Sequence, residues 1–115
     1  MSYEIQTSKE FETSVKKLAK RYRSIPNDLE VLRESLFENP LQGVELCPNI
    51  RKVRMAITSK GRGKSGGARV ITATAIVAEN EGRIALLTIY DKSDASNVNL
   101  TVIKQIAHHL GINID

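Results

Sequence analysis

The first 40 residues contain two apolar stripes with the period of an α-helix. The first stripe follows Thr7 and Glu10, which have the spacing of a capping box at the start of a helix. The second begins beside Pro26, which suits a first helical turn, and ends at Asn39-Pro40. Because only a few residues separate the two helices, we predict an antiparallel helical hairpin. The apolar positions are Phe11, Val15, Leu18 and Tyr22, followed by Ile25, Leu29, Leu32 and Leu36.

The second half of the chain changes to the alternating period of β-strands. Residues 52–57 alternate, with apolar side chains on one face and Lys52 and Arg54 on the other, which predicts a half-buried strand. Residues 69–77 are rich in Val, Ile and Thr and predict the next strand. Residues 83–90 are almost all apolar at their centre, so we expect a strand covered on both faces. The turn signal between these two strands is Glu79-Asn80-Glu81-Gly82.

The two ends of the chain complete one α+β domain over residues 1–115. Residues 3–6 alternate like a short strand, and a last helix is capped by Asn97 or Asn99 and ended by Gly111. The predicted order is strand, helix, helix, three strands and helix. We expect the helices to bury their apolar stripes on one face of an antiparallel sheet, which gives two layers.

The positive charge of the chain is concentrated in one stretch. The chain has 17 basic and 13 acidic residues. Seven of the basic residues and no acidic residue lie between Leu46 and Ala78, so the remainder has 10 basic and 13 acidic residues. A glycine-rich run lies inside this stretch and suits a phosphate-rich partner, with a solvated basic loop as the alternative. The seven cations are Arg51, Lys52, Arg54, Lys60, Arg62, Lys64 and Arg69.

Several common kinds of site do not fit the sequence. Gly63-Lys64-Ser65 is not a P-loop, because Thr58 stands where the earlier glycine is required. His108 and His109 are adjacent, so on a helix they point about 100° apart and form no joint site. Cys47 is the single cysteine and has no zinc-ligand partner. We therefore expect no metal and no cofactor, and no apolar run is long enough to cross a membrane, so we expect a cytoplasmic protein.

The remaining candidates are Lys, Arg and Tyr side chains, and such a set can cleave RNA. RNA supplies its own nucleophile, the 2′-hydroxyl group. The protein has to hold the phosphate in line, neutralise charge in the transition state and help to move two protons. Arginine suits charge neutralisation because its guanidinium group is planar and always charged, and a lysine crowded by other cations can accept a proton.

Three segments of the chain resemble the RelE/ParE superfamily of bacterial toxins, in particular its RelE-type, HigB-like branch. They are Arg51-Lys52-Val53-Arg54, KGRGKSGGARVI over 60–71 and LLTIYDKS over 86–93. The resemblance implies the toxin of a type II toxin–antitoxin pair, a metal-independent endoribonuclease that enters the ribosomal A site and cuts translated mRNA. It also implies an antitoxin protein as partner, with hetero-oligomers of toxin and antitoxin on operator DNA.

The resemblance also implies roles for individual residues. Arg69 matches the arginine that contacts the scissile phosphate, with a structural arginine bonded to helix carbonyls as the alternative. Lys52 and Arg54 match basic residues that face the substrate, or else form the polar face of an exposed sheet. A tyrosine at position 90 can stack on a base or share a proton. The candidates for catalysis are Arg69, Lys60, Arg62, Tyr90 and Lys92, and those for RNA binding are Arg51, Lys52, Arg54 and Lys64.

The chain departs from the RelE pattern at two places. The family has an arginine just after the lysine of the last strand and a tyrosine several residues later, where this chain has Ser93 and Asn99. Tyr90 or Lys60 is then the candidate to replace that tyrosine. Two alternatives stay open for the whole chain. One is a ParE-like inhibitor of DNA gyrase, and the other is a catalytically decayed toxin that binds its antitoxin as a co-repressor.

Overall fold

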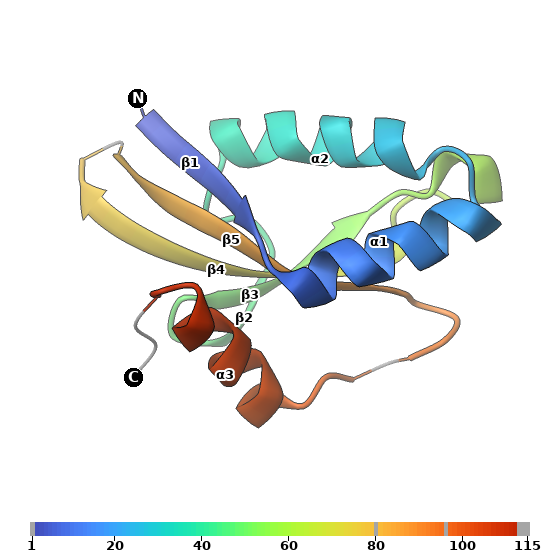
Figure 1. Cartoon of the computed structure of the whole chain (residues 1–115). Helices are drawn as coiled ribbons and strands as arrows, with labels where there is room; N and C mark the ends of the chain where they lie inside the picture. Colours follow the sequence, from blue (N-terminus) through green and yellow to red (C-terminus); the bar gives the residue numbers. More distant parts are fainter. Residues whose placement is uncertain (1, 80, 96, 113–115) are drawn as a thin grey trace.

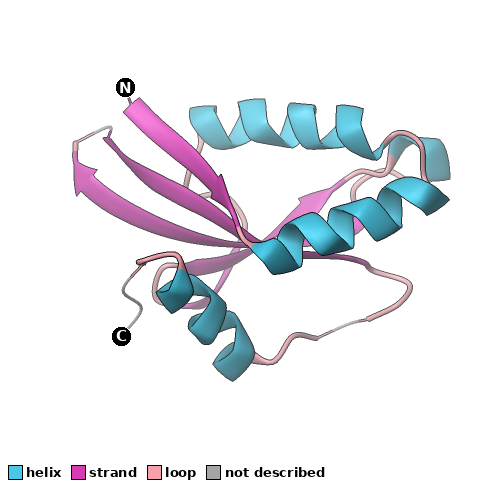
Figure 2. Cartoon of the chain, in the orientation of Figure 1, coloured by secondary structure: helices cyan, strands magenta, loops and turns pink. Residues whose placement is uncertain are grey.

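A five-stranded sheet lies at the centre of the chain, with helices on both of its faces (Figures 1 and 2). The structure is a computed structural model that describes residues 2–79, 81–95 and 97–112. The strand order in the sheet is β1-β5-β4-β3-β2. Along the chain the elements are β1 (Ser2–Thr7), α1 (Lys9–Arg21), α2 (Ile25–Glu38), β2 (Val44–Cys47), β3 (Ile50–Met55), the 3₁₀ turn η1 (Thr58–Lys60), β4 (Ala68–Ala78), β5 (Glu81–Asp91) and α3 (Leu100–His109).

The long antiparallel pair β4 and β5 forms the middle of the sheet. All seven residues from Ala68 to Thr74 are buried, as are Ile84 to Leu87, which confirms that the apolar strand is covered on both faces. The predicted turn signal lies between these two strands, and Asn80 is outside the described residues. At one end of this pair, the ends of β3, β4 and β5 lie side by side.

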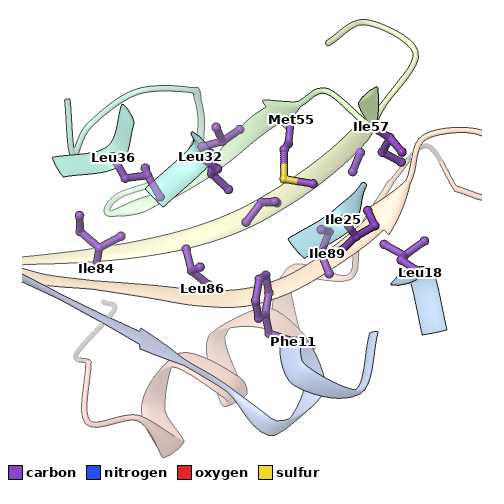
Figure 3. Packing of buried hydrophobic residues seen from close by; sticks show 13 residues of the cluster. Phe11, Leu18, Ile25, Leu32, Leu36, Met55, Ile57, Ile84, Leu86 and Ile89 are labelled. Carbon is purple, nitrogen blue, oxygen red and sulfur yellow. The ribbon is translucent and has the colours of Figure 1, made fainter. Parts of the chain in front are cut away.

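The helices α1 and α2 cover one face of the sheet with the two predicted apolar stripes. Ser8 is the N-cap of α1, one residue later than predicted, because its hydroxyl both accepts from the Phe11 N–H at 2.9 Å and donates to the Leu87 carbonyl at 2.6 Å. A second contact in the core thus selects Ser8 over Thr7 as the cap. The buried helix residues of this layer are Phe11, Leu18, Ile25, Leu32 and Leu36 (Figure 3).

The helix α3 packs on the opposite face of the sheet. Ile103, Ile106 and Ala107 belong to a separate buried cluster that includes Ile50 and Leu87. The α+β class is confirmed, but the expectation that all helices share one face is wrong for α3. The central strands are apolar on both faces, so both faces need a cover, and α1 and α2 already occupy one of them.

Two strands at the edges of the sheet differ from the prediction. β1 runs parallel to β5, so the sheet is mixed and not purely antiparallel. Because β1 and β5 are far apart in sequence, no hairpin fixes their relative direction. The short strand β2 was not predicted, and it pairs with β3 through the turn Pro48-Asn49, in which Asn49 has a φ of 70°. This turn starts β3 at Ile50, two residues before the predicted strand.

Candidate active site

Three predicted site residues form one row across neighbouring strands. Arg54 of β3 lies directly opposite Arg69 of β4, and Arg69 lies opposite Tyr90 of β5. Lys52 points to the same face as Arg54 because side chains alternate along a strand. This is the face that α3 covers further along the sheet, since Ile50, two residues before Lys52, belongs to the cluster beneath α3.

The row lines a hollow of about 350 Å³ at the end of the sheet. Four cations and Tyr90 contribute to its wall, and the described residues that line it include no carboxylate. Like charges directly opposite each other on adjacent strands destabilise a sheet, so the Arg54–Arg69 pair favours an anion between or beside the two side chains. The four cations are Lys52, Arg54, Arg69 and Lys92.

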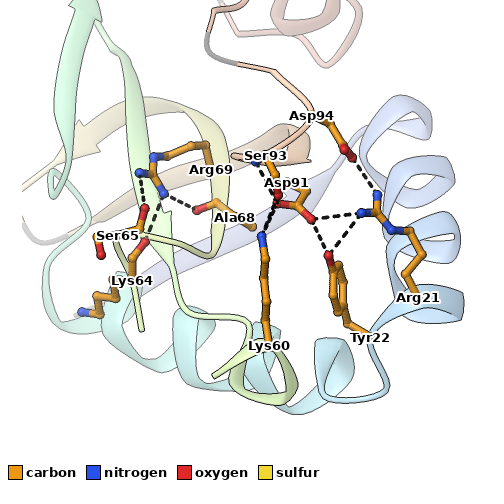
Figure 4. Close-up of polar contacts among 10 residues, drawn as sticks. All are labelled: Arg21, Tyr22, Lys60, Lys64, Ser65, Ala68, Arg69, Asp91, Ser93 and Asp94. Atoms are coloured by element: carbon orange, nitrogen blue, oxygen red, sulfur yellow. Dashed lines mark hydrogen bonds and ion pairs between the residues drawn. The ribbon is translucent and has the colours of Figure 1, made fainter. Parts of the chain in front are cut away.

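Arg69 both supports the basic loop and reaches the hollow. It is only 6% exposed, and its Nη1 donates to the carbonyls of Lys64 and Ala68, each at 3.1 Å (Figure 4). Its Nη2 donates to the Ser65 carbonyl, also at 3.1 Å. A guanidinium group has five N–H donors, so two remain for a ligand after these three bonds. None of these three carbonyls lies at the end of a helix. Arg69 therefore has a structural role, but it supports the segment before β4 and does not bind helix carbonyls as the alternative predicted.

Tyr90 presents a hydroxyl group that has no hydrogen-bond partner among the described residues, although this atom is buried. Burial raises the pKa of Tyr90, and the nearby positive charge of Arg69 opposes this shift in part. The phenol therefore keeps its proton at neutral pH. A buried hydroxyl without a partner is costly, and it gains a partner if a ligand oxygen enters the hollow.

Four predicted site residues lie outside this hollow, namely Arg51, Lys60, Arg62 and Lys64. Arg51 is on the opposite face of β3 from its neighbours Lys52 and Arg54, where it pairs with Glu45 at 3.3 Å. The alternation of the strand already contained this signal. Lys60 lies in η1, where its Nζ is 2.7 Å from an Asp91 oxygen and 2.7 Å from the Ser93 hydroxyl (Figure 4).

The loop 61–67 carries Arg62 and Lys64 beside the hollow. Residues 61–65 are exposed, and Gly61 has a φ of 74°, which allows the sharp turn after η1. Gly67 is buried against β3, and a Cβ atom there would lie 2.3 Å from the Met55 carbonyl oxygen. Lys64 and Arg54 together line a second hollow of about 120 Å³ beside α2. Lys64 therefore lies near Arg54, which lines both hollows.

The residues that replace the RelE arginine and tyrosine have structural partners here. Ser93 donates to Asp91 from both its backbone N–H and its hydroxyl group. Asn99 is the N-cap of α3, and its side chain accepts from the N–H groups of Thr101 at 2.9 Å and Val102 at 3.3 Å. Neither position belongs to the hollow.

Asp91 is the residue that sequence reasoning did not single out. Its side chain is buried, yet Lys60, Tyr22, Arg21 and Ser93 all bond to it. The sequence signal that could have pointed to Asp91 is its position, because it is a carboxylate between Tyr90 and Lys92 at the end of an apolar strand.

Neither a metal site nor a membrane helix is present in the part of the chain that the structure describes. No three His, Cys, Asp or Glu side chains gather there as metal ligands. The helices of residues 2–79, 81–95 and 97–112 are also too short or too polar to cross a membrane.

The order of elements and the sheet define a RelE-like fold. The chain is similar to the crystal structure of the isolated E. coli RelE toxin in its P21 form, with a TM-score of 0.55. The alignment covers 91% of this chain and 99% of that chain, at 14% sequence identity. No protein-family model matches the sequence. At this identity the likeness concerns the fold, so the activity has to be argued from the residues of the hollow.

Proposed function

We propose that this chain is the toxin of a type II toxin–antitoxin pair, and that it cleaves translated mRNA on the ribosome without a metal ion. The observation that supports this most is the Arg54–Arg69–Tyr90 row in a hollow that four cations line and whose described residues include no carboxylate. Such a row recognises a phosphate group and places a proton-bearing phenol beside it. The RelE-like fold agrees with this class of protein.

In the proposed reaction, the RNA 2′-oxygen attacks the adjacent phosphorus and the bond from phosphorus to the 5′-oxygen breaks. Arg54 and the two free N–H groups of Arg69 neutralise the equatorial oxygens. Tyr90, which keeps its proton at neutral pH, donates that proton to the leaving 5′-oxygen. The proton of the 2′-hydroxyl passes to Lys52 or Lys92, which line the hollow, and the lysine that accepts it has to be an uncharged amine when RNA is bound. The products carry a 2′,3′-cyclic phosphate and a 5′-hydroxyl.

The proposed partners are an antitoxin, the ribosomal A site and mRNA. An acidic segment of an antitoxin that covers the hollow and the loop 61–67 would neutralise the same cations that bind RNA. We propose that the complex of the two proteins forms hetero-oligomers on operator DNA, as in type II pairs. The protein then acts freely on RNA only when the antitoxin is absent.

The proposal is tested by inducing the chain alone in bacteria and mapping 5′ ends on a translated reporter mRNA. The test variant is Arg54→Ala, because the Arg54 side chain is exposed and makes no hydrogen bond with the described residues, so the fold tolerates its loss. Arg69→Ala is compared with it, and Arg33→Ala on the outer side of α2 is the matched control. We expect new in-frame cuts with the wild type and the control that disappear with both test variants.

Other outcomes separate the alternatives. Growth arrest with intact transcripts would contradict RNA cleavage and favour a gyrase inhibitor. Normal growth with intact transcripts would favour a protein that only binds its antitoxin.

A further inference from the structure

The turn η1 is bonded to two parts of the fold, since Thr58 and Ser59 bond to the start of α2 and Lys60 bonds to the end of β5. The Thr58 N–H donates to Asp28 of α2 at 2.9 Å, and the Thr58 hydroxyl donates to the other oxygen of the same carboxylate. Ser59 bonds to Ser24 through its N–H at 2.9 Å and its hydroxyl at 2.8 Å. We refer to Ser24, Asp28 and Asp91 as the η1 anchor, since Asp91 binds the third residue.

Asp91 is the strongest part of the η1 anchor. Its side chain is fully buried and receives hydrogen bonds from Tyr22 at 2.6 Å and Lys60 at 2.7 Å, and from the N–H of Ser93 at 3.0 Å. Burial alone would raise the pKa of Asp91, but the hydrogen bonds from Lys60, Ser93 and Tyr22 outweigh it and hold the pKa well below its usual value. The carboxylate therefore stays charged and connects η1 to the end of β5 and to α1.

Lys60 is fully occupied by this arrangement. Its ammonium group donates to Asp91 and Ser93, and it lies 5.8 Å from the centre of the Tyr22 ring, within the range of a cation–π contact. The side chain is 16% exposed and does not line the hollow that contains the Arg54–Arg69–Tyr90 row. An amine with these contacts is poorly placed to take a proton from RNA.

The η1 anchor is connected to the hollow through the backbone. Asp91 stands between Tyr90 and Lys92, and the Lys92 N–H donates to the Gly67 carbonyl at 3.0 Å. The loop 61–67 is thus fixed at its start by η1 and at its end by Gly67. Arg69 binds the same loop from the face of the hollow, through the carbonyls of Lys64 and Ser65 (Figure 4).

We propose that Lys60 is a positioning residue, whose pairing with Asp91 fixes the loop 61–67 and the end of β5 so that Tyr90 and Lys92 face the bound phosphate. This inference rests on the proposed function for its effect on cleavage, but not for its effect on the loop. A displacement of about 1 Å at a reacting group can cost a hundredfold in rate, so loss of the Lys60–Asp91 pair should slow cleavage in the hollow.

The first test compares Lys60→Arg with Lys60→Met in the cleavage assay. Arginine keeps the ion pair with Asp91 but does not give up its proton, so it supports positioning and not proton transfer. We expect Lys60→Met to cut about tenfold to a hundredfold more slowly. Lys60→Arg should stay within a few-fold of the wild type. Equal losses in both variants, or full activity in Lys60→Met, would overturn the proposal.

The second test does not depend on cleavage. Amide hydrogen exchange is followed at Lys60, Gly61 and Lys92, whose N–H groups bond within η1 and to Gly67. In Lys60→Met we expect faster exchange at these amides and unchanged exchange in the middle of β4. Lys64→Met is the matched control, because it removes the same amine from the exposed part of the same loop.

A milder variant covers the case in which Lys60→Met does not fold. Thr58→Val removes only the hydroxyl that bonds to Asp28 and keeps the backbone bond, so it should accelerate exchange at the same amides to a smaller degree. Unchanged exchange in both variants would overturn the role of the η1 anchor. If the wild type leaves RNA intact while the exchange pattern changes as expected, the proposed nuclease fails and the positioning of the loop stands.

Discussion

Arg69 shows how one side chain can combine support and binding. Its three bonds to backbone carbonyls keep the guanidinium group in one orientation, and that orientation leaves two N–H groups without a partner among the described residues. A charged group that is held in advance loses little freedom when a phosphate arrives, which favours binding in the transition state. The structural and functional interpretations of this arginine are therefore compatible.

The variant Tyr90→Phe removes one hydroxyl group and tests its effect on cleavage separately from its effect on stability. The Tyr90 hydroxyl is buried without a partner, so its removal should leave the melting temperature unchanged or slightly higher. If this hydroxyl donates the proton to the leaving oxygen, cleavage should fall by about a hundredfold or more. Both quantities are measured on the same purified variant, by thermal unfolding and by cleavage of translated mRNA. A Tyr90→Phe protein that cuts at the wild-type rate would exclude this role.

Asp91→Asn should change how stability depends on pH. The pKa of Asp91 is lower in the folded chain than in the unfolded chain, so its charge contributes stability above about pH 4, and this contribution is lost as the pH falls further. The variant should lose about 3 kcal/mol at neutral pH, because its partners Lys60 and Arg21 stay without a carboxylate. The free energy of unfolding is measured with urea between about pH 3 and pH 7, a range that includes the usual pKa of Asp. It should fall less steeply toward acid pH in Asp91→Asn than in the wild type. Parallel curves for the two proteins would argue against a buried charge at this position.

At the level of elements, the apolar stripes predicted both α1 and α2 because helix periodicity is a local property of the sequence. Pairing direction and layer are not local. Nothing in residues 3–6 says that β1 runs parallel to β5, and nothing in the stripe of α3 says which face it covers. The predicted site shows the same limit. The alternation of β3 already separates Arg51 from Lys52 and Arg54, whereas only the contact with Asp91 distinguishes Lys60 from the other cations.

Asn99→Ala tests whether the residue in place of the RelE tyrosine serves α3 alone. The Asn99 side chain accepts from two N–H groups of the first helical turn, so its loss should cost about 1 kcal/mol. Cleavage should be unchanged, since Asn99 does not line the hollow. The free energy of unfolding and the cleavage rate are measured together, with Thr101→Ala as the neighbouring control on the same turn. A large loss of cleavage in Asn99→Ala alone would place this residue in the reaction.

At the scale of the whole molecule, the charge is distributed unevenly over the fold. Cations of β3 and β4 and Lys92, which directly follows β5, gather at one end of the sheet, although they come from segments up to 40 residues apart. Asp91 follows Tyr90 in β5 and so points to the other face, and Asp28 of α2 lines the second hollow beside Arg54 and Lys64. Both carboxylates are buried and bonded to η1. The sequence contained the concentration of charge, but the fold decides which of these cations remain available to an anionic partner.

The salt dependence of RNA binding measures this availability. Each phosphate contact with single-stranded RNA contributes about −0.7 to the slope of log K against log salt concentration. Arg62 and Lys64 are exposed at the tip of the loop, so the double variant Arg62→Ala/Lys64→Ala should reduce the slope by about 1.4. Lys9→Ala/Arg33→Ala removes the same charge from α1 and α2 and should leave the slope nearly unchanged.

The comparison of these two double variants isolates position from net charge, because both lower the charge of the chain equally. Fluorescence anisotropy with a labelled oligoribonucleotide at several salt concentrations gives the slopes directly. If both variants reduce the slope to the same extent, RNA responds to the overall charge, and the loop 61–67 has no special place in the interface. If only the loop variant does so, the phosphates lie beside the hollow, where Arg54 and Arg69 stand directly opposite each other and gain most from an anion.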